Sequence, residues 1–248
     1  MNNEISLKYQ ASVFGDFSKI VPSEETLKRC IESYFSQGWL PSNLQEFVGS
    51  KNAIESRLAL QSMRTGITIN VLSNRIDFIV SPLPGSPAAT VTMQSFLTQF
   101  SNMYPQLASQ FGVAVNRVGF VCDHFLKVQR HEELNIFKSK LLALDLDNFA
   151  GDSAMPVEWS VKNTSRIPSA TFDGAPINVI CNFSKVTAQL ADPNGQKEFE
   201  TPHLSIDVNY PAENTVPSVS PDQVVNFVNE AASIESQVRL RFDELRSA

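Results

Sequence analysis

Apolar residues alternate with polar ones in several short segments and recur every three or four positions in others, so the chain predicts both strands and helices. Ser73 and Asn74 separate two alternating segments, as is typical of a two-residue hairpin turn. The predicted strands lie near 5–14, 44–49, 54–62, 66–72, 75–81, 114–128, 155–167, 176–190 and 202–210. Those between 44 and 81 follow one another closely and should form an antiparallel meander.

Four amphipathic helices are predicted. The first begins near Ser23, whose hydroxyl can cap the chain, and ends at Gly38; the second runs from Thr90 to Phe111; the third spans about 131–144. The fourth begins with Ser220, Pro221 and Gln223, which form a capping box with proline in the first turn. The apolar stripe of the first helix comprises Leu27, Cys30, Ile31, Tyr34 and Phe35.

Each half of the chain runs strand, helix, several strands, long helix, and the order begins again after Gly112. This predicts an α+β protein of antiparallel sheets covered by long helices, with an amino-terminal lobe at 1–112 and a carboxy-terminal lobe at 113–248. One continuous sheet with helices on one face is the alternative, in which both halves pack as one compact unit. The segment 81–90, with three prolines and a glycine, is the best candidate for a linker.

Composition favours an ordinary globular protein, with 42% hydrophobic and 19% charged residues. The 17 phenylalanines have no polar group to present at a surface, which indicates a role in packing. A net charge of -6 argues against nucleic-acid binding, which depends on basic residues. The three cysteines are far apart and lie in apolar surroundings, and no secretory or membrane-spanning pattern is present, so we expect a cytoplasmic protein.

The sequence contains no established catalytic, metal or phosphate-binding motif, so we expect neither an enzyme nor a bound cofactor or metal. Alternation places Cys122 and His124 on one face of a strand, but a zinc site needs three or four ligands. Asp145 and Asp147 are expected to meet solvent at a helix end. The basic stretch 127–140, and the arginines of the last helix, should be solvated faces rather than a phosphate-binding track.

The last helix carries the predicted interaction surface. Its apolar stripe has a period near 3.5 and is longer than one lobe needs, so it could pair with its twin in a homodimer. The alternative is a helix that packs only on its own strands. The residues assigned to this surface are Phe227, Ile234, Val238 and Phe242. A small apolar ligand held between the sheet and this helix would also suit the excess of phenylalanine.

Several blocks carry a family resemblance: RLALQSMRTGITINVLSNRIDFIV, NRVGFVCDHFL, SIDVNY and RFDEL. The chain resembles an uncharacterised, sporadically distributed bacterial family of about this length. Gly119, Phe120 and Asp207 match its pattern, whereas Cys122 stands where the family usually has an aromatic residue. The resemblance implies no activity, because none is established for the family.

Together these features predict a protein without catalytic machinery that acts as an interaction partner or regulatory subunit. The patchy occurrence of the family it resembles suggests a bacterial accessory or defence-type system. The competing hypothesis is a binding module for a small hydrophobic ligand. A flat, exposed apolar area would favour a protein partner, and a closed pocket lined by phenylalanine would favour the ligand.

Overall fold

A computed structural model describes residues 4–82, 88–126, 140, 159–192, 195–211 and 218–247. It contains nine strands and three α-helices in the described part of the chain, with a short 3₁₀ helix at Phe35–Gln37. The elements, in chain order, are β1 (Glu4–Gly15), α1 (Glu24–Tyr34), β2 (Trp39–Val48), β3 (Ala53–Ser62), β4 (Thr68–Val71), β5 (Arg75–Val80), α2 (Met93–Phe111), β6 (Val115–Leu126), β7 (Ser160–Pro168), β8 (Pro176–Asp192), β9 (Gly195–Tyr210) and α4 (Pro221–Ser247).

The helix starts follow local capping chemistry. The Ser23 side chain accepts a hydrogen bond from the backbone N–H of Thr26, as expected for a cap. Ser220 and Gln223 form the predicted reciprocal pair at the start of α4. The predicted cap of α2 at Thr90 is wrong, because Thr92 and Ser95 bond each other's backbone N–H groups and start the helix two residues later.

Other predicted boundaries also shift. β2 begins at Trp39 rather than near 44, and β9 begins at Gly195 rather than near 202. The predicted helix near 131–144 lies outside the described residues except for Lys140, as do Asp145 and Asp147, the basic stretch apart from that lysine, and the middle of the 81–90 segment. The turn between β7 and β8 contains Asp173 and Gly174, both with positive φ, as their residue types favour.

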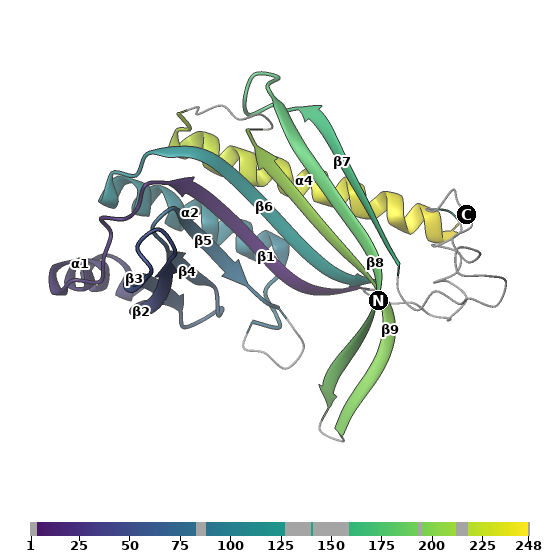
Figure 1. The fold of residues 1–248 in the computed structure, drawn as a ribbon, viewed down its shortest axis with the longest axis horizontal. Coiled ribbons are helices and arrows are strands. Elements are labelled where there is room, and N and C mark those ends of the chain that lie inside the picture. The colour runs from purple at the N-terminus through teal and green to yellow at the C-terminus, as the bar shows by residue number, and fades with distance from the viewer. Residues whose placement is uncertain are drawn as a thin grey trace.

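All nine strands form one antiparallel sheet in the order β2-β3-β4-β5-β1-β6-β9-β8-β7. The α+β class is therefore confirmed. The strands between 39 and 80 form the predicted meander, and its last strand, β5, pairs with β1. β1 also pairs with β6, so the strands of 4–80 and those of 115–210 share a single sheet. In Figure 1 the helices α2 and α4 lie along the same face of this sheet.

The core lies between that face and the helices, and much of it is phenylalanine. Phe78 meets Phe100 edge to face with ring centroids 4.8 Å apart, and Phe96 lies 6.3 Å from Phe120. From α4, Phe227 is fully buried and its ring centroid lies 5.7 Å from that of Phe172. The prediction that phenylalanine serves packing is confirmed for these residues.

The opposite face of the sheet is polar along a line that crosses the strands. The strand registers place small polar residues or glycine opposite one another in the series Asn70, Asp77, Ser12, Gly119, Asn209 and Asn178. Ser12 Oγ donates to Asp77 Oδ1 at 2.6 Å, and Asn178 Nδ2 donates to Asn209 Oδ1 at 3.2 Å. These hydrogen bonds satisfy polar groups that would be costly to bury unpaired.

One carboxylate ties α4 to the far end of the sheet. Glu230 accepts hydrogen bonds from Ser169 Oγ at 2.8 Å and from the backbone N–H of Ala170 at 2.7 Å and Thr171 at 3.2 Å. Burial opposes the charged form, but these hydrogen bonds outweigh it and hold the pKa of Glu230 below its usual value. The charged form of Glu230 therefore stabilises the turn that follows β7.

The Glu230→Gln variant should be less stable than the wild type at neutral pH by about 1.5–3 kcal/mol, the range for hydrogen bonds to a charged group. Because the pKa of Glu230 is lowered in the folded state, the stabilisation by its charged form is complete above its unfolded-state pKa of about 4.3. This stabilisation is lost as the pH falls through the folded-state pKa. The difference should therefore vanish in acid. Urea unfolding at several values between about pH 7 and about pH 3 measures it, and a difference independent of pH would contradict this account.

Candidate interaction surface at the β2 edge of the sheet

Exposed apolar side chains concentrate at one end of the molecule. Of seven large hydrophobic side chains exposed in the described part of the chain, six lie between residues 21 and 63. We call these six the amino-terminal apolar surface: Val21, Ile31, Phe35, Phe47, Ile54 and Met63. They belong to α1 and the segments next to it, to the β2-β3 hairpin, and to the turn after β3.

Two of these residues correct the sequence prediction for the first helix. The predicted apolar stripe, which should face the core, includes Ile31 and Phe35, but these two residues are 49% and 59% exposed. Cys30 and Tyr34 of the same predicted stripe are buried, and the Tyr34 hydroxyl donates to the side chain of Gln110 on α2. The helix therefore packs through a narrower stripe than predicted and leaves an apolar strip uncovered.

Phe47 and Ile54 form the most exposed part of this surface on the sheet. They face each other across the β2-β3 hairpin and are 65% and 66% exposed. Such directly opposed apolar pairs stabilise a hairpin. Their exposure to solvent is nevertheless unfavourable, and apolar groups of this kind commonly mark contact surfaces.

The two edges of the sheet differ in charge. At one edge, β7 carries the exposed Lys162 and Arg166, and charged side chains are a common means of preventing unwanted strand pairing. At the other edge, β2 pairs only with β3 among the described strands, and its single charged residue is Glu46. Pro41, which lacks a backbone donor, is the one residue in β2 typical of a protected edge.

The charge of Glu46 is used inside the molecule. Its Oε2 accepts from Arg57 Nε at 2.7 Å and from the backbone N–H of Ser73 at 2.9 Å, and its Oε1 accepts from Ser73 Oγ at 2.8 Å. Arg57 is 1% exposed and also donates to Glu55 Oε2 at 2.5 Å and to the carbonyl of Ser18 at 2.9 Å. This cluster fixes β2 to β3 and to the β4-β5 turn.

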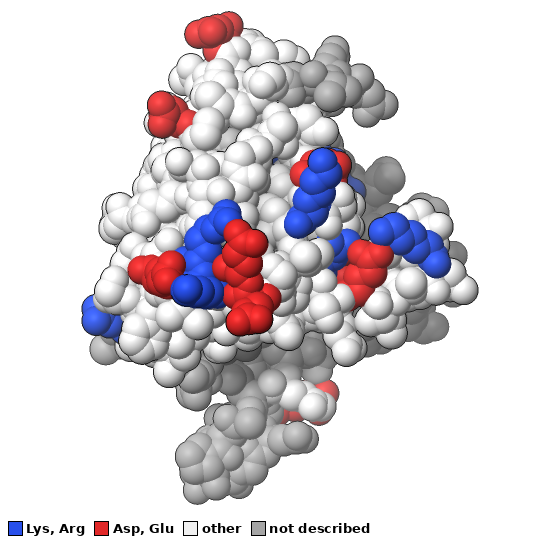
Figure 2. Space-filling view, turned by 90° about the vertical axis from the view of Figure 1, so that its left-hand side faces the viewer, with Lys and Arg blue, Asp and Glu red and all other residues white. Residues whose placement is uncertain are grey.

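Figure 2 looks at this end of the molecule. Charged side chains appear there in small groups of mixed sign, with wide uncharged areas between them. On α1 four of the five exposed charges pair within the helix, Glu25 with Arg29 at 2.8 Å and Lys28 with Glu32 at 4.0 Å, and Glu24 is the fifth. A partner would therefore meet no strong field of one sign on α1.

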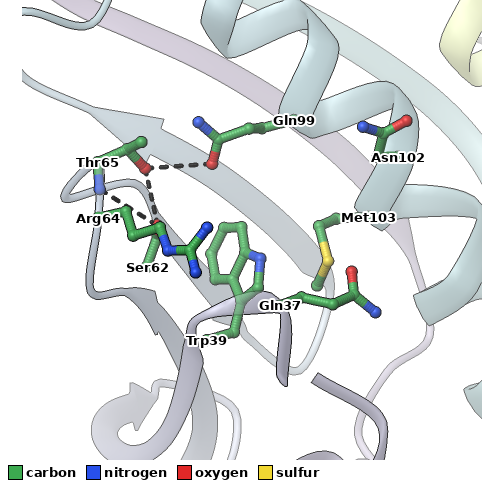
Figure 3. A pocket seen from close by; sticks show the side chains of 8 residues that line it. All are labelled: Gln37, Trp39, Ser62, Arg64, Thr65, Gln99, Asn102 and Met103. Atoms are coloured by element: carbon green, nitrogen blue, oxygen red, sulfur yellow. Dashed lines mark hydrogen bonds between the residues drawn. The ribbon is translucent and has the colours of Figure 1, made fainter. Parts of the chain in front are cut away.

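A pocket of about 260 Å³ opens beside the first residues of β2 (Figure 3). Its walls come from three parts of the fold: the start of β2, the turn between β3 and β4, and one side of α2. The lining residues are Gln37, Trp39, Ser62, Arg64, Thr65, Gln99, Asn102 and Met103. Arg64 is the only charged residue among them, and none is acidic.

Local geometry places these groups. Gly38, with φ of 85°, ends the 3₁₀ helix and turns the chain so that Gln37 and Trp39 border the same space. Thr65 Oγ1 donates to Gln99 Oε1 at 3.1 Å, which leaves the Gln99 amide nitrogen to donate elsewhere. Figure 3 shows Arg64 and Trp39 among the side chains that line this pocket. The pocket thus combines one cation, amide groups and an aromatic face.

The residues predicted as an interaction surface on the last helix face the molecule itself. Phe227 is fully buried, and the Phe242 ring stacks on Phe183 with centroids 4.8 Å apart. Ile234 and Val238 are partly buried and also pack on the core. These four residues do not gather on an exposed face. A role for them in a homodimer stays a prediction.

Cys122 and His124 share the helix side of β6 and are both buried. His124 Nε2 lies 2.9 Å from Glu235 Oε1 on α4, and the same oxygen lies 2.6 Å from Arg239 Nε. The prediction that the arginines of the last helix lie on a purely solvated face is therefore wrong for Arg239. Among the described residues, no group of three or more His, Cys, Asp or Glu side chains is arranged to hold a metal.

Burial also governs the thiols. It raises the pKa of Cys30 to about 11 and that of Cys122 well above its usual value. Both are therefore protonated at neutral pH, whereas a nucleophilic cysteine needs its thiolate. All three cysteines are free thiols, and Cys181 is partly buried.

No protein-family model and no curated protein matches the chain. The resemblance to a sporadically distributed bacterial family therefore stays a prediction. None of the helices in the described ranges is both long and apolar enough to cross a lipid bilayer.

The Glu46→Gln variant tests whether the buried cluster holds the β2 edge in place. This variant removes one of the two carboxylates that pair with the buried Arg57, and Glu55 remains as the other. The free energy of unfolding should therefore fall by about 2–3 kcal/mol, less than when a buried ion pair is broken completely. Urea unfolding measures the free energy. Glu25→Gln, which removes an exposed pair on α1, is the matched control and should cost no more than about 0.5 kcal/mol. Equal losses in the two variants would contradict a structural role for Glu46.

Proposed function

We propose that this protein is a non-catalytic interaction subunit that binds an extended segment of a partner protein along β2. The observation that carries the proposal is the concentration of six of the seven exposed large hydrophobic side chains at this end of the described chain. An added strand would gain main-chain hydrogen bonds from β2, which pairs with β3 alone among the described strands, and apolar contacts from the side chains beside it.

The difference between the edges supports β2 rather than β7 as the docking strand. A partner strand on β7 would meet the exposed charges of Lys162 and Arg166. On β2 it would meet Phe47, while Glu46 is held by Arg57 and Ser73. Pairing along β2 therefore requires no removal of a solvated charge of that strand from water, which is a large cost at an interface.

The alternative function, binding of a small hydrophobic ligand between the sheet and α4, has less support. Phe227, Val228 and Ala231 of α4 are fully buried and occupy the space that such a ligand would need. The pocket beside Trp39 is lined mainly by polar residues and lies at the other side of α2. We therefore place the interaction at the β2 edge rather than in the core.

The similar order of the two halves forms a second part of the proposal. The first strands of the two halves, β1 and β6, pair with each other at the centre of the sheet. On its other side each pairs with the last strand of its own half, β1 with β5 and β6 with β9. This supports two similarly ordered lobes, 1–112 and 113–248, joined in one sheet. A superposition of the halves that failed to align β1 with β6 and α2 with α4 would contradict it.

A cytoplasmic location and a role in a bacterial accessory or defence-type system complete the proposal. The three free cysteines support a reducing compartment. The place in a bacterial system depends on the sequence blocks that resemble the bacterial family.

The double variant Phe47→Ser, Ile54→Ser tests the docking surface. Both side chains are about two thirds exposed, at 65% and 66%, so the fold should survive their replacement. We expect affinity capture from the native cell to recover a partner with the wild type and at least tenfold less of it with the variant, equivalent to a loss of about 1.4 kcal/mol. Quantitative mass spectrometry of the captured proteins gives the measurement.

Leu240→Ser is the matched control, because Leu240 is 62% exposed but lies on α4, outside the amino-terminal apolar surface. It should capture the partner as the wild type does. Equal recovery with the double variant would overturn the proposal. Light scattering of the purified wild type checks self-association, and a dimer that the double variant disrupts would identify a second copy of the chain as the occupant instead.

A further inference from the structure

The pocket beside Trp39 lies at the amino end of the proposed docking strand. Trp39 is the first residue of β2 and also lines the pocket, and Gln37 lines it just before the strand begins. A segment paired along β2 would therefore reach this pocket at one of its ends. Which end depends on the direction of the added strand.

Strand direction decides this question. Every strand pair in the sheet is antiparallel. β2 runs from Trp39 to Val48, so an antiparallel segment beside it would have its amino end near the hairpin and its carboxyl end near Trp39. Antiparallel pairing is also slightly more stable per residue than parallel pairing. The added segment would thus bring its carboxyl end to the pocket.

The chemistry of the pocket suits an anion. Arg64 forms no ion pair among the described residues, and no residue that lines the pocket is acidic. The Gln99 oxygen already accepts from Thr65, so its amide nitrogen is available to donate. A guanidinium binds a carboxylate through two parallel hydrogen bonds, and such charge-assisted bonds are among the strongest in proteins.

From these three observations we propose that the pocket binds the terminal carboxylate of the partner segment, with Arg64 as the cation that recognises it. The volume of about 260 Å³ accommodates a terminal group rather than a folded element. The proposal rests on the proposed strand addition along β2 and names its ligand more closely: an extended peptide that ends beside Trp39. Arg64 and the Gln99 amide supply donors, while Trp39 supplies an apolar wall.

Position also favours a peptide terminus over a free anion. Gly38 lies against Arg64: a side chain at Gly38 would begin 3.4 Å from Arg64 Nε. The Arg64 side chain therefore lies next to Gly38, the residue that immediately precedes β2. A free anion would gain the contact with Arg64 but none of the main-chain or apolar contacts along β2.

The test uses a bead-bound peptide library with randomised carboxy-terminal residues, made once with free carboxylates and once as terminal amides. The protein should select the free acids at least tenfold over the amides. Arg64→Ala should abolish this preference and Arg64→Lys should keep part of it, since lysine retains the charge but not the planar fork. Arg29→Ala, which removes an exposed arginine of α1, is the matched control and should leave the preference unchanged.

The outcomes separate the two proposals. Equal selection of acids and amides, lost in the Phe47→Ser, Ile54→Ser variant, would overturn carboxylate recognition and leave strand addition intact. If the protein bound neither the free-acid nor the amide peptides, both proposals would be overturned. A preference for acids that survives Arg64→Ala would overturn the role of Arg64.

A second measurement distinguishes a peptide terminus from a free anion. Trp39 is one of two tryptophans, so Trp159→Phe leaves its fluorescence as the only tryptophan signal. In this variant a selected free-acid peptide should change the emission, whereas acetate and inorganic phosphate at the same concentration should not. A response to phosphate as strong as that to the peptide would overturn the proposal and identify an anion site instead.

Discussion

The antiparallel pairing of β1 with β6 is the interaction on which the rest of the structure depends. Its register extends from Glu4 opposite Leu126 to Gly15 opposite Val115, and it joins strands from both halves of the chain. On the helix side the pairing buries Ala11, Val13, Val118 and Phe120 to 1% exposure or less. Without this pairing each group of strands would have another free edge and an apolar face without its neighbour. The pairing therefore makes one core of two half-cores.

A sheet that is open rather than closed must end in two edges, and this constraint leads directly to the interaction surface. β7 carries exposed lysine and arginine at its edge, whereas the single charge of β2 is held inside the fold by Arg57. The same contact that stabilises the β2-β3 hairpin therefore removes a charge that would otherwise protect its edge. Stability and availability for binding depend on the same residue, Glu46.

The sequence predicts what local chemistry decides. The caps at Ser23 and Ser220 and the turn at Asp173 and Gly174 involve residues only a few positions apart, so their identity is enough. Features that depend on contacts between distant parts of the chain could not be predicted from the sequence. Periodicity shows that Ile31 and Phe35 lie near the buried face of a helix, but not how wide that face is. The pocket brings Trp39 and Arg64 to Gln99 on α2, residues with no shared sequence pattern.

The arrangement of the β2 edge also determines what kind of binding it can support. Trp39 is only 4% exposed, and the hairpin is anchored through Arg57, so the strand and one wall of the pocket are already in place before a partner arrives. A preorganised site loses little conformational entropy on binding, which raises affinity for a given contact area. Arg64, by contrast, is exposed on a long flexible side chain. The ordering cost of binding would therefore fall on the partner segment and on Arg64, and a charged terminal group is the feature best able to offset it.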